Sequence, residues 1–154
     1  MIIKVCGMRE PENIRAIEQA GADWMGFIFF PRSARYVSHR PEYLPEQCRR
    51  IGVFVNESTE NILPKAQEFG LHDIQLHGRE TPEQCRELKA AGQEVIKVFS
   101  IACESDLQLT GRYEDSCDYF LFDTACPGYG GSGKTFNWDI LRVYQGKTPA
   151  GYPS

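Results

Sequence analysis

The sequence lacks a hydrophobic run long enough to cross a membrane. Its longest apolar stretch, Gly26–Phe30, falls far below the roughly 20 residues that a bilayer requires. The first residues, Met1–Lys4, lead directly into a strand-like segment, without the charged region, apolar core and cleavage site of a secretory signal. We therefore expect a cytoplasmic protein with no membrane partner.

Positive charge is not in excess either. The chain has 17 Lys and Arg against 21 Asp and Glu, which gives a formal net charge of −4. A nucleic-acid partner would favour a basic face, so we expect none. A small anionic substrate is compatible with this charge, because a local cluster of amides and Arg side chains can bind phosphate on an acidic protein.

Paired cysteines and clustered histidines are also missing. No two of the 6 cysteines have C-x-x-C spacing, and the 3 histidines are scattered. The even count is compatible with disulfides, but Cys6, Cys48 and Cys85 fall inside predicted helices and strands. We therefore expect reduced thiols and no zinc site.

What the sequence does contain is a repeated alternation of short apolar runs and helical segments. The runs are almost continuously apolar, which is typical of strands that are covered on both faces of a parallel sheet. The predicted strands are Ile2–Cys6, Asp23–Phe29, Ile51–Val55, Asp73–His77, Glu94–Phe99 and Asp118–Asp123.

Helices are predicted between these runs. Thr81–Ala91 has the clearest signals, because Thr81 can cap it, Gln84 completes a capping box and Gly92 ends it. Ser58–Phe69 contains Pro64, so we expect irregular first turns or a late start. The other predicted helices are Pro11–Ala20 and the shorter Pro41–Arg49 and Trp138–Tyr144, while Asp106–Tyr113 is ambiguous.

This βα order allows either a doubly wound open sheet or a (β/α)8 barrel. A doubly wound sheet would carry a glycine-rich loop after its first strand, but Gly7-Met8-Arg9 does not fit that pattern. Polar residues follow nearly every strand, as in a barrel whose chemistry lies at the carboxyl ends of the strands. We therefore predict an α/β fold of the (β/α)8 TIM-barrel type, a single domain over residues 1–154 with about six of the eight βα units.

Two strand ends carry residues that suit acid–base chemistry. Cys6 ends the first strand, where it is either a reactive group or a packing thiol. Asp123 ends the apolar sixth strand, where burial would favour a protonated carboxyl and a general-acid role. The alternative for Asp123 is a cap that accepts hydrogen bonds from the next loop.

Other polar residues at the same end are candidates for substrate binding. Arg32 and Arg35 follow the second strand, and such a pair either holds a carboxylate or phosphate or is solvated surface charge. Gln75 and His77 bracket the end of the fourth strand, where His77 is either a site residue or a satisfied core histidine.

A glycine-rich segment follows the sixth predicted strand. Gly128–Thr135 formally fits the phosphate-binding pattern of nucleotide hydrolases, but that loop follows the first strand of its fold. We expect a mobile loop that closes over the substrate and places Gly130 and Gly131 near the substrate. The alternative is a plain flexible loop.

Taken in order along the chain, seven motifs resemble those of the phosphoribosylanthranilate isomerases. The similarity runs from Ile2 to about Thr148. The motifs are Lys4–Met8, Gly26–Phe29, Pro31–Val37, Gly52–Asn56, Gln75–Gly78, Phe122–Thr124 and Gly128–Trp138.

The resemblance implies an Amadori rearrangement of N-(5-phosphoribosyl)anthranilate, a phosphorylated small molecule, without a metal or organic cofactor. It assigns the general base to Cys6 and the general acid to Asp123, and it places the anthranilate carboxylate on Arg35. Gln75, His77, Gly130 and Gly131 are the further substrate-binding candidates.

The predicted strands stop at the sixth, whereas family members hold the sugar phosphate with loops after strands seven and eight. We therefore expect about two βα units to be absent. Two alternatives to an active enzyme follow: an inactive barrel fragment, or an interaction module in which the open edge, at strands one and six, pairs with another copy.

Overall fold

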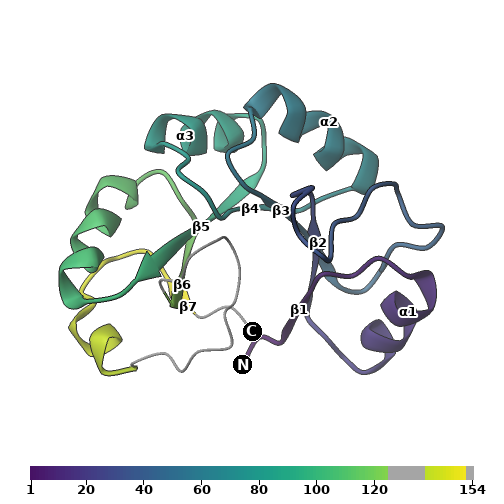
Figure 1. The fold of residues 1–154 in the computed structure, drawn as a ribbon, viewed down its shortest axis with the longest axis horizontal. Helices are drawn as coiled ribbons and strands as arrows, with labels where there is room; N and C mark the ends of the chain where they lie inside the picture. The colour runs from purple at the N-terminus through teal and green to yellow at the C-terminus, as the bar shows by residue number, and fades with distance from the viewer. Residues whose placement is uncertain (125–137, 152–154) are drawn as a thin grey trace.

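The computed structural model describes residues 1–124 and 138–151, and its centre is a seven-stranded parallel sheet in the order β1-β2-β3-β4-β5-β6-β7. The sheet curls, with the strands on the inside of the arc and the helices on the outside (Figure 1). The strands are β1 (Lys4–Cys6), β2 (Trp24–Ile28), β3 (Arg49–Phe54), β4 (Asp73–Leu76), β5 (Glu94–Ile101), β6 (Tyr119–Thr124) and β7 (Ala150–Gly151). The helices are α1 (Pro11–Gln19), α2 (Thr59–Phe69), α3 (Pro82–Ala90) and the 3-10 helices η1 (Glu104–Tyr113) and η2 (Trp138–Val143).

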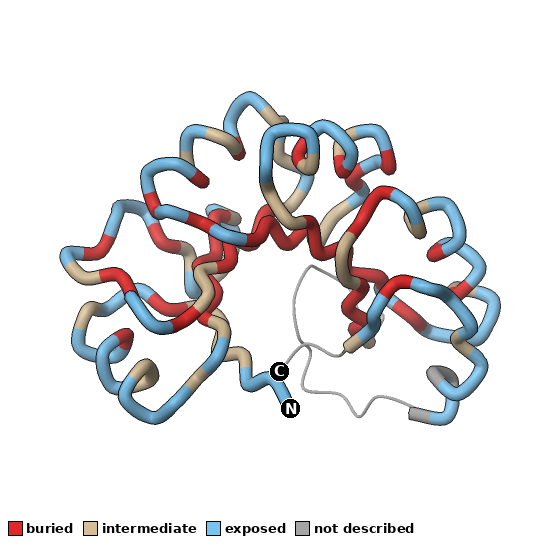
Figure 2. Tube along the Cα trace, turned by 180° about the vertical axis from the view of Figure 1, so that it is seen from behind, coloured by how far each residue is buried: buried red, intermediate tan, exposed pale blue. Residues whose placement is uncertain are grey.

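The two faces of the sheet are packed differently. The larger apolar cluster lies between the sheet and the helices, because it joins strand residues such as Phe27 and Phe120 to helix residues such as Ile62 and Leu88. A smaller cluster of strand residues lies on the concave face: Ile51, Ile96, Val98 and Leu121. Figure 2 shows the buried positions concentrated along the strands. Since side chains alternate along a strand, this packing decides which polar residues reach the concave face.

All the predicted strands are confirmed, and the described residues form one strand more than expected. β7 was missed because it is only two residues long and has no apolar pattern. It pairs in parallel with β6, with Ala150 beside Phe120 and Gly151 beside Leu121.

Helix α2 begins earlier than Pro64 suggested. Ser58 caps it by accepting a hydrogen bond from the Asn61 N–H, and Pro64 lies inside a continuous helix, so the expected irregular or late start is wrong. In α3 only half of the predicted capping box forms. Thr81 accepts from the Gln84 N–H at 3.2 Å, while the Gln84 side chain donates to the Glu57 carbonyl at 2.6 Å.

The helix predicted at Pro41–Arg49 is wrong. The segment has no helix, and Arg49 is the first residue of β3. Its backbone is held by a residue from α1, because the Glu18 carboxylate accepts from the N–H groups of Glu46 and Gln47, each at 2.6 Å. The ambiguous stretch Asp106–Tyr113 lies in η1, and the predicted helix at Trp138–Tyr144 is the 3-10 helix η2.

Candidate active site

The predicted site residues come from strands that are far apart in sequence. Val5, Leu76 and Phe122 pack toward the helices, so the alternation of side chains turns Cys6, Gln75 and the β6 residue Asp123 toward the concave face. The fold therefore brings these polar residues to one side of the sheet, at the carboxyl half of its strands.

Cys6 is half-buried and has a glycine directly beside it. Its neighbour in the register is Gly26, where an added Cβ would lie 2.7 Å from Cys6 Sγ and 3.3 Å from Cys6 Cα. The missing side chain at Gly26 thus leaves the room that the thiol occupies.

Lys4, which no sequence pattern marked as a site residue, lies on the same face. The Lys4 ammonium group donates a hydrogen bond to Gln75 Oε1. Burial lowers the pKa of Lys4, whereas the nearby Cys6 and Asp73 act in the opposite direction. The Lys4 side chain therefore lies close to the Cys6 thiol and fixes the Gln75 side chain.

His77 and Asp123 form the polar pair at the carboxyl ends of β4 and β6. His77 Nε2 lies 3.5 Å from Asp123 Oδ2, and the two side chains are only 12% and 11% exposed. Asp123 Oδ1 also accepts from the N–H of Thr124, the last residue of β6, at 2.8 Å, while the loop that this carboxylate was considered to cap lies outside the described residues. One oxygen accepts from the strand backbone and the other faces the imidazole.

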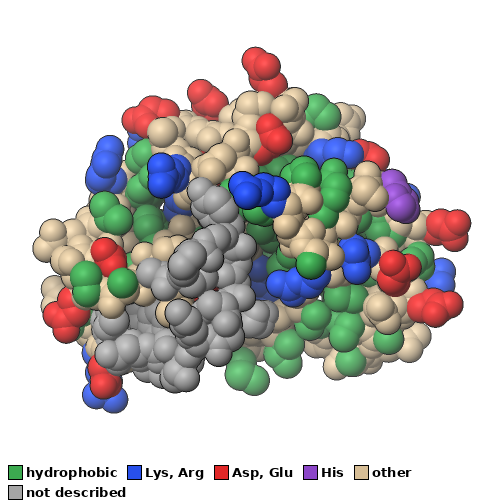
Figure 3. Space-filling view, viewed as in Figure 1, with side chains coloured by type: hydrophobic (Ala, Val, Ile, Leu, Met, Phe, Trp, Pro, Cys, Tyr) green, Lys and Arg blue, Asp and Glu red, His purple; other side chains and the backbone are tan. Residues whose placement is uncertain are grey.

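Arg35 reaches the first strand end from the loop after β2. Its Nη1 donates to the Cys6 carbonyl at 3.2 Å, and its aliphatic stem covers Gly7, where a Cβ would lie 2.6 Å from Arg35 Cδ. Gly7 has a φ of +86°, a left-handed conformation that favours glycine. The exposed guanidinium is thereby held next to Cys6. Lys and Arg side chains also gather near the centre of the face seen in Figure 3, with acidic side chains further out.

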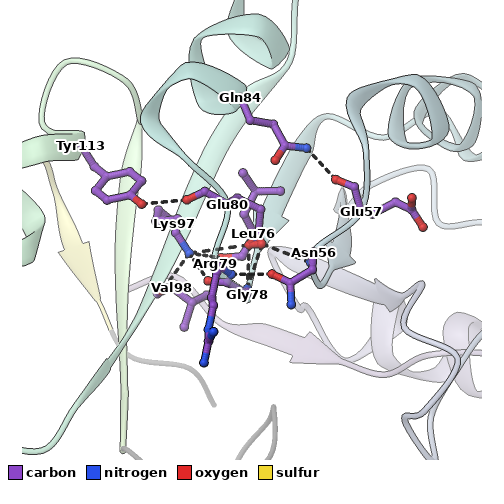
Figure 4. Close-up of polar contacts among 10 residues, drawn as sticks. All are labelled: Asn56, Glu57, Leu76, Gly78, Arg79, Glu80, Gln84, Lys97, Val98 and Tyr113. Carbon is purple, nitrogen blue, oxygen red and sulfur yellow. Dashed lines mark hydrogen bonds and ion pairs between the residues drawn. The ribbon is translucent and has the colours of Figure 1, made fainter.

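A buried polar cluster that no sequence motif indicated lies behind the site. Lys97 and Glu80, each only 3% exposed, hold the turn between β4 and α3 together with Asn56 and Tyr113 (Figure 4). A lysine inside the apolar run of β5 was the one available signal, since a Lys is almost never fully buried unless it is paired.

Several expectations concern residues that the structure does not describe. Gly130, Gly131 and the whole segment 125–137 lie outside the described residues. Within the described part, no group of three or more His, Cys, Asp or Glu side chains is placed to hold a metal. No helix there is long and apolar enough to cross a membrane. The described cysteines carry free thiols: Cys6, Cys48, Cys85, Cys103 and Cys117.

Comparisons with known proteins agree on one family. The family profile described as N-(5'phosphoribosyl)anthranilate (PRA) isomerase matches residues 3–150. A relative named N-(5'-phosphoribosyl)anthranilate isomerase from Phocaeicola vulgatus is 87% identical over 149 residues, which cover 97% of this chain and 73% of the relative. One of the same name from Parabacteroides distasonis is 50% identical and covers 97% of this chain and 70% of the relative.

Solved structures lead to the same family. The crystal structure of phosphoribosyl anthranilate isomerase from Thermotoga maritima superimposes with a TM-score of 0.81 at 38% identity, covering 94% of this chain and 72% of that one. Another isomerase was solved in complex with reduced 1-(o-carboxyphenylamino)-1-deoxyribulose 5-phosphate. It has a TM-score of 0.67 at 28% identity and covers 99% of this chain and 87% of that one.

Proposed function

The chain belongs to the N-(5′-phosphoribosyl)anthranilate isomerase family, and on that premise we propose that Cys6 is the general base of its reaction and Asp123 the general acid. The family makes the protein an isomerase of tryptophan biosynthesis with an α/β fold of the (β/α)8 barrel type. The observation that supports the assignment is that both side chains project from strand ends onto the concave face.

The reaction needs one proton donor and one proton acceptor. Asp123 gives its proton to the ribose ring oxygen, which opens the sugar to a Schiff base. Cys6 then removes the proton from C2′, and the enolamine tautomerises to the ketone. The surroundings suit these roles, because Asp123 is buried at its strand end and the Lys4 side chain lies close to the Cys6 thiol.

Arg35 is proposed to bind the anthranilate carboxylate, with Gln75 and His77 contributing polar contacts. A guanidinium offers paired N–H donors that match a carboxylate, and Arg35 is already held next to Cys6. The bound deoxyribulose 5-phosphate derivative in a related isomerase supports a phosphorylated substrate for this chain. Gly130 and Gly131 complete the proposed substrate-binding set.

Two substitutions test the acid–base assignment. Cys6→Ala and Asp123→Asn should each lower kcat by about 10²–10⁴-fold with little change in melting temperature, since general acids and bases typically contribute that much. The loss of anthranilate fluorescence reports turnover. Asp115→Asn, at an exposed position before β6 and so at the amino ends of the strands, is the matched control. If Cys6→Ala kept most of the activity, the thiol would be a packing group and not the base.

We also propose that a polypeptide limited to these 154 residues associates through the edges of its sheet. Among the described residues β1 pairs only with β2, and Ile2 and Ile3 beside it are 56% and 48% exposed. The other edge was expected at β6, but it is formed by β7. A Thermotoga maritima isomerase is described as dimeric, which is compatible with association in this family.

The proposed location is the cytoplasm, with the small phosphorylated substrate as the main partner. Free thiols at the described cysteines are what a reducing compartment maintains, and this supports the proposal.

A further inference from the structure

We propose that the buried pair Lys97–Glu80 is a positioning device that fixes the turn after β4 and thereby sets His77 against Asp123. This inference rests on the proposed function of Asp123 as the acid. Neither Lys97 nor Glu80 is assigned a role in the acid–base scheme above, and Lys97 lies on the helix side of β5, between the core residues Val95 and Phe99.

Lys97 uses its ammonium group on backbone carbonyls. Nζ donates to Gly78 O at 2.8 Å, to Val98 O at 3.2 Å and to Leu76 O at 3.4 Å, and it lies 3.6 Å from Glu80 Oε1. These acceptors lie on β4, β5 and the turn that follows β4. One buried cation therefore ties the turn to the two strands.

Glu80 binds the same residue, Gly78, on its N–H side. Its carboxylate oxygens accept from the Gly78 N–H at 2.6 and 2.9 Å, while Lys97 takes the Gly78 carbonyl. The Tyr113 hydroxyl donates to the Glu80 carbonyl at 2.7 Å. Gly78 is thus bound on both its donor and its acceptor side (Figure 4).

The loop after β3 holds the turn from the other side. Asn56, with a left-handed φ of 52°, accepts a hydrogen bond from the Arg79 N–H on Oδ1 at 2.6 Å. A Cβ on Gly78 would lie 2.8 Å from Glu80 Oε2, so the packing leaves no room for a side chain there. The turn has little freedom to move.

His77 immediately precedes this turn, so the position of the turn fixes the position of His77. The His77 N–H donates to Phe54 O at 2.9 Å, and His77 Nε2 lies 3.5 Å from Asp123 Oδ2. This distance is at the limit of a hydrogen bond, so a small shift of His77 would make or break the contact. A displacement of about 1 Å can cost about 10²-fold in rate. A buried ion pair is often replaceable by apolar residues without loss of stability, so its contribution here is to geometry.

The test replaces both members of the pair, because a single replacement would leave a lone buried charge. Lys97→Met/Glu80→Gln is combined with His77→Gln in a double-mutant cycle, and kcat, KM and melting temperature are measured on the purified protein. We expect kcat to fall about 10–10²-fold in the His77 background while KM changes less. In the His77→Gln background the same pair of substitutions should cost no more than about twofold, because the path through His77 is already gone.

Asp73→Asn is the matched control. Asp73 is fully buried and accepts from Arg49 Nε at 2.8 Å, but it lies at the amino ends of the strands. Its loss should lower the melting temperature and leave the kcat ratio between the His77 and His77→Gln backgrounds unchanged within about twofold.

An unchanged kcat in the Lys97→Met/Glu80→Gln protein, or an equal fall in both His77 backgrounds, would overturn the proposal. If that protein does not fold, Tyr113→Phe, which removes only the hydroxyl donor to Glu80, replaces it in the same cycle. An equal effect of Tyr113→Phe on kcat in both His77 backgrounds would also overturn the proposal. Cys6→Ala and Asp123→Asn in the same assay separate this outcome from failure of the acid–base assignment, which would leave those two variants active.

Discussion

At the scale of single residues, the thiol of Cys6 depends on a glycine in the next strand. We predict that Gly26→Ala lowers kcat by up to about 10²-fold, because the new Cβ would lie 2.7 Å from Sγ and would displace it. Gly111→Ala, which meets nothing within 4 Å, should leave kcat unchanged. Steady-state kinetics and thermal melts of both variants decide this. Wild-type kcat in a folded Gly26→Ala protein would show that the thiol position does not limit the reaction.

The site residues that the sequence could predict are those at strand ends. Cys6, His77 and Asp123 follow apolar runs, and the carboxyl ends of parallel strands meet on one side of the sheet. The partners of these residues could not be predicted in the same way. The contacts of Lys4 with Gln75 and of Lys97 with Glu80 depend on strand register and on the path of the turn, which no spacing in the sequence records.

At the scale of elements, α2 contains a residue that opposes helix formation. Pro64 is exposed, and it has no N–H to donate to the carbonyl of Glu60 one turn earlier. We predict that Pro64→Ala stabilises the protein by about 1–3 kcal/mol, since the missing hydrogen bond is restored and no packing is lost. Pro11→Ala, at the first turn of α1 where a proline costs nothing, should not stabilise. Denaturant melts measure both, and equal effects would contradict the explanation.

The docking of β7 depends on a carboxylate in the chain before β6. Burial would raise the pKa of Glu114, but hydrogen bonds from Thr148, Lys147 and Tyr144 outweigh it and hold the pKa below its ordinary value of 4.5. A depressed folded pKa stabilises the docked segment above the unfolded value, and this stabilisation is lost as the pH falls through the folded value. We therefore predict that the protection of the Phe120 amide, which donates to Pro149 O, falls as the pH drops below about 4.5.

Hydrogen exchange at the Phe120 amide measures this loss, and Glu114→Gln is the comparison. The variant should show weaker protection at neutral pH and little further change in the acid range, because it has no carboxyl group to titrate there. Identical protection in both proteins at every pH would mean that Glu114 does not hold the segment.

The elements that sequence patterns failed to predict share one property: their backbone partners are distant. The segment Pro41–Cys48 is held by Glu18, which precedes it by more than 20 residues, and not by its own backbone. β7 exists through its pairing with Phe120 and Leu121. Local periodicity predicts elements whose own residues carry the apolar or capping pattern, and it correctly predicted β1 to β6 and the helices α1, α2 and α3.

At the scale of the whole molecule, we predict that the open edge of the sheet at β1 promotes association. A polypeptide of these 154 residues should sediment as a dimer or larger species whose weight rises with concentration, because β1 pairs only with β2 among the described residues and lies beside the exposed Ile2 and Ile3. Ile3→Lys, which places a charge at this edge, should shift the distribution toward monomer. Analytical ultracentrifugation gives the answer. A monomer at every concentration would refute edge association.

The strand order also has a consequence for how the chain acquires its structure. Each strand pairs with the one before it in sequence, with partners 20 residues apart between β1 and β2 and 30 apart between β6 and β7. Loop closure over such distances costs only slightly more for the longer crossovers. During synthesis, each strand after β1 therefore leaves the ribosome later than the strand with which it first pairs. The sheet can grow in one direction, from β1 toward β7, at the pace of translation.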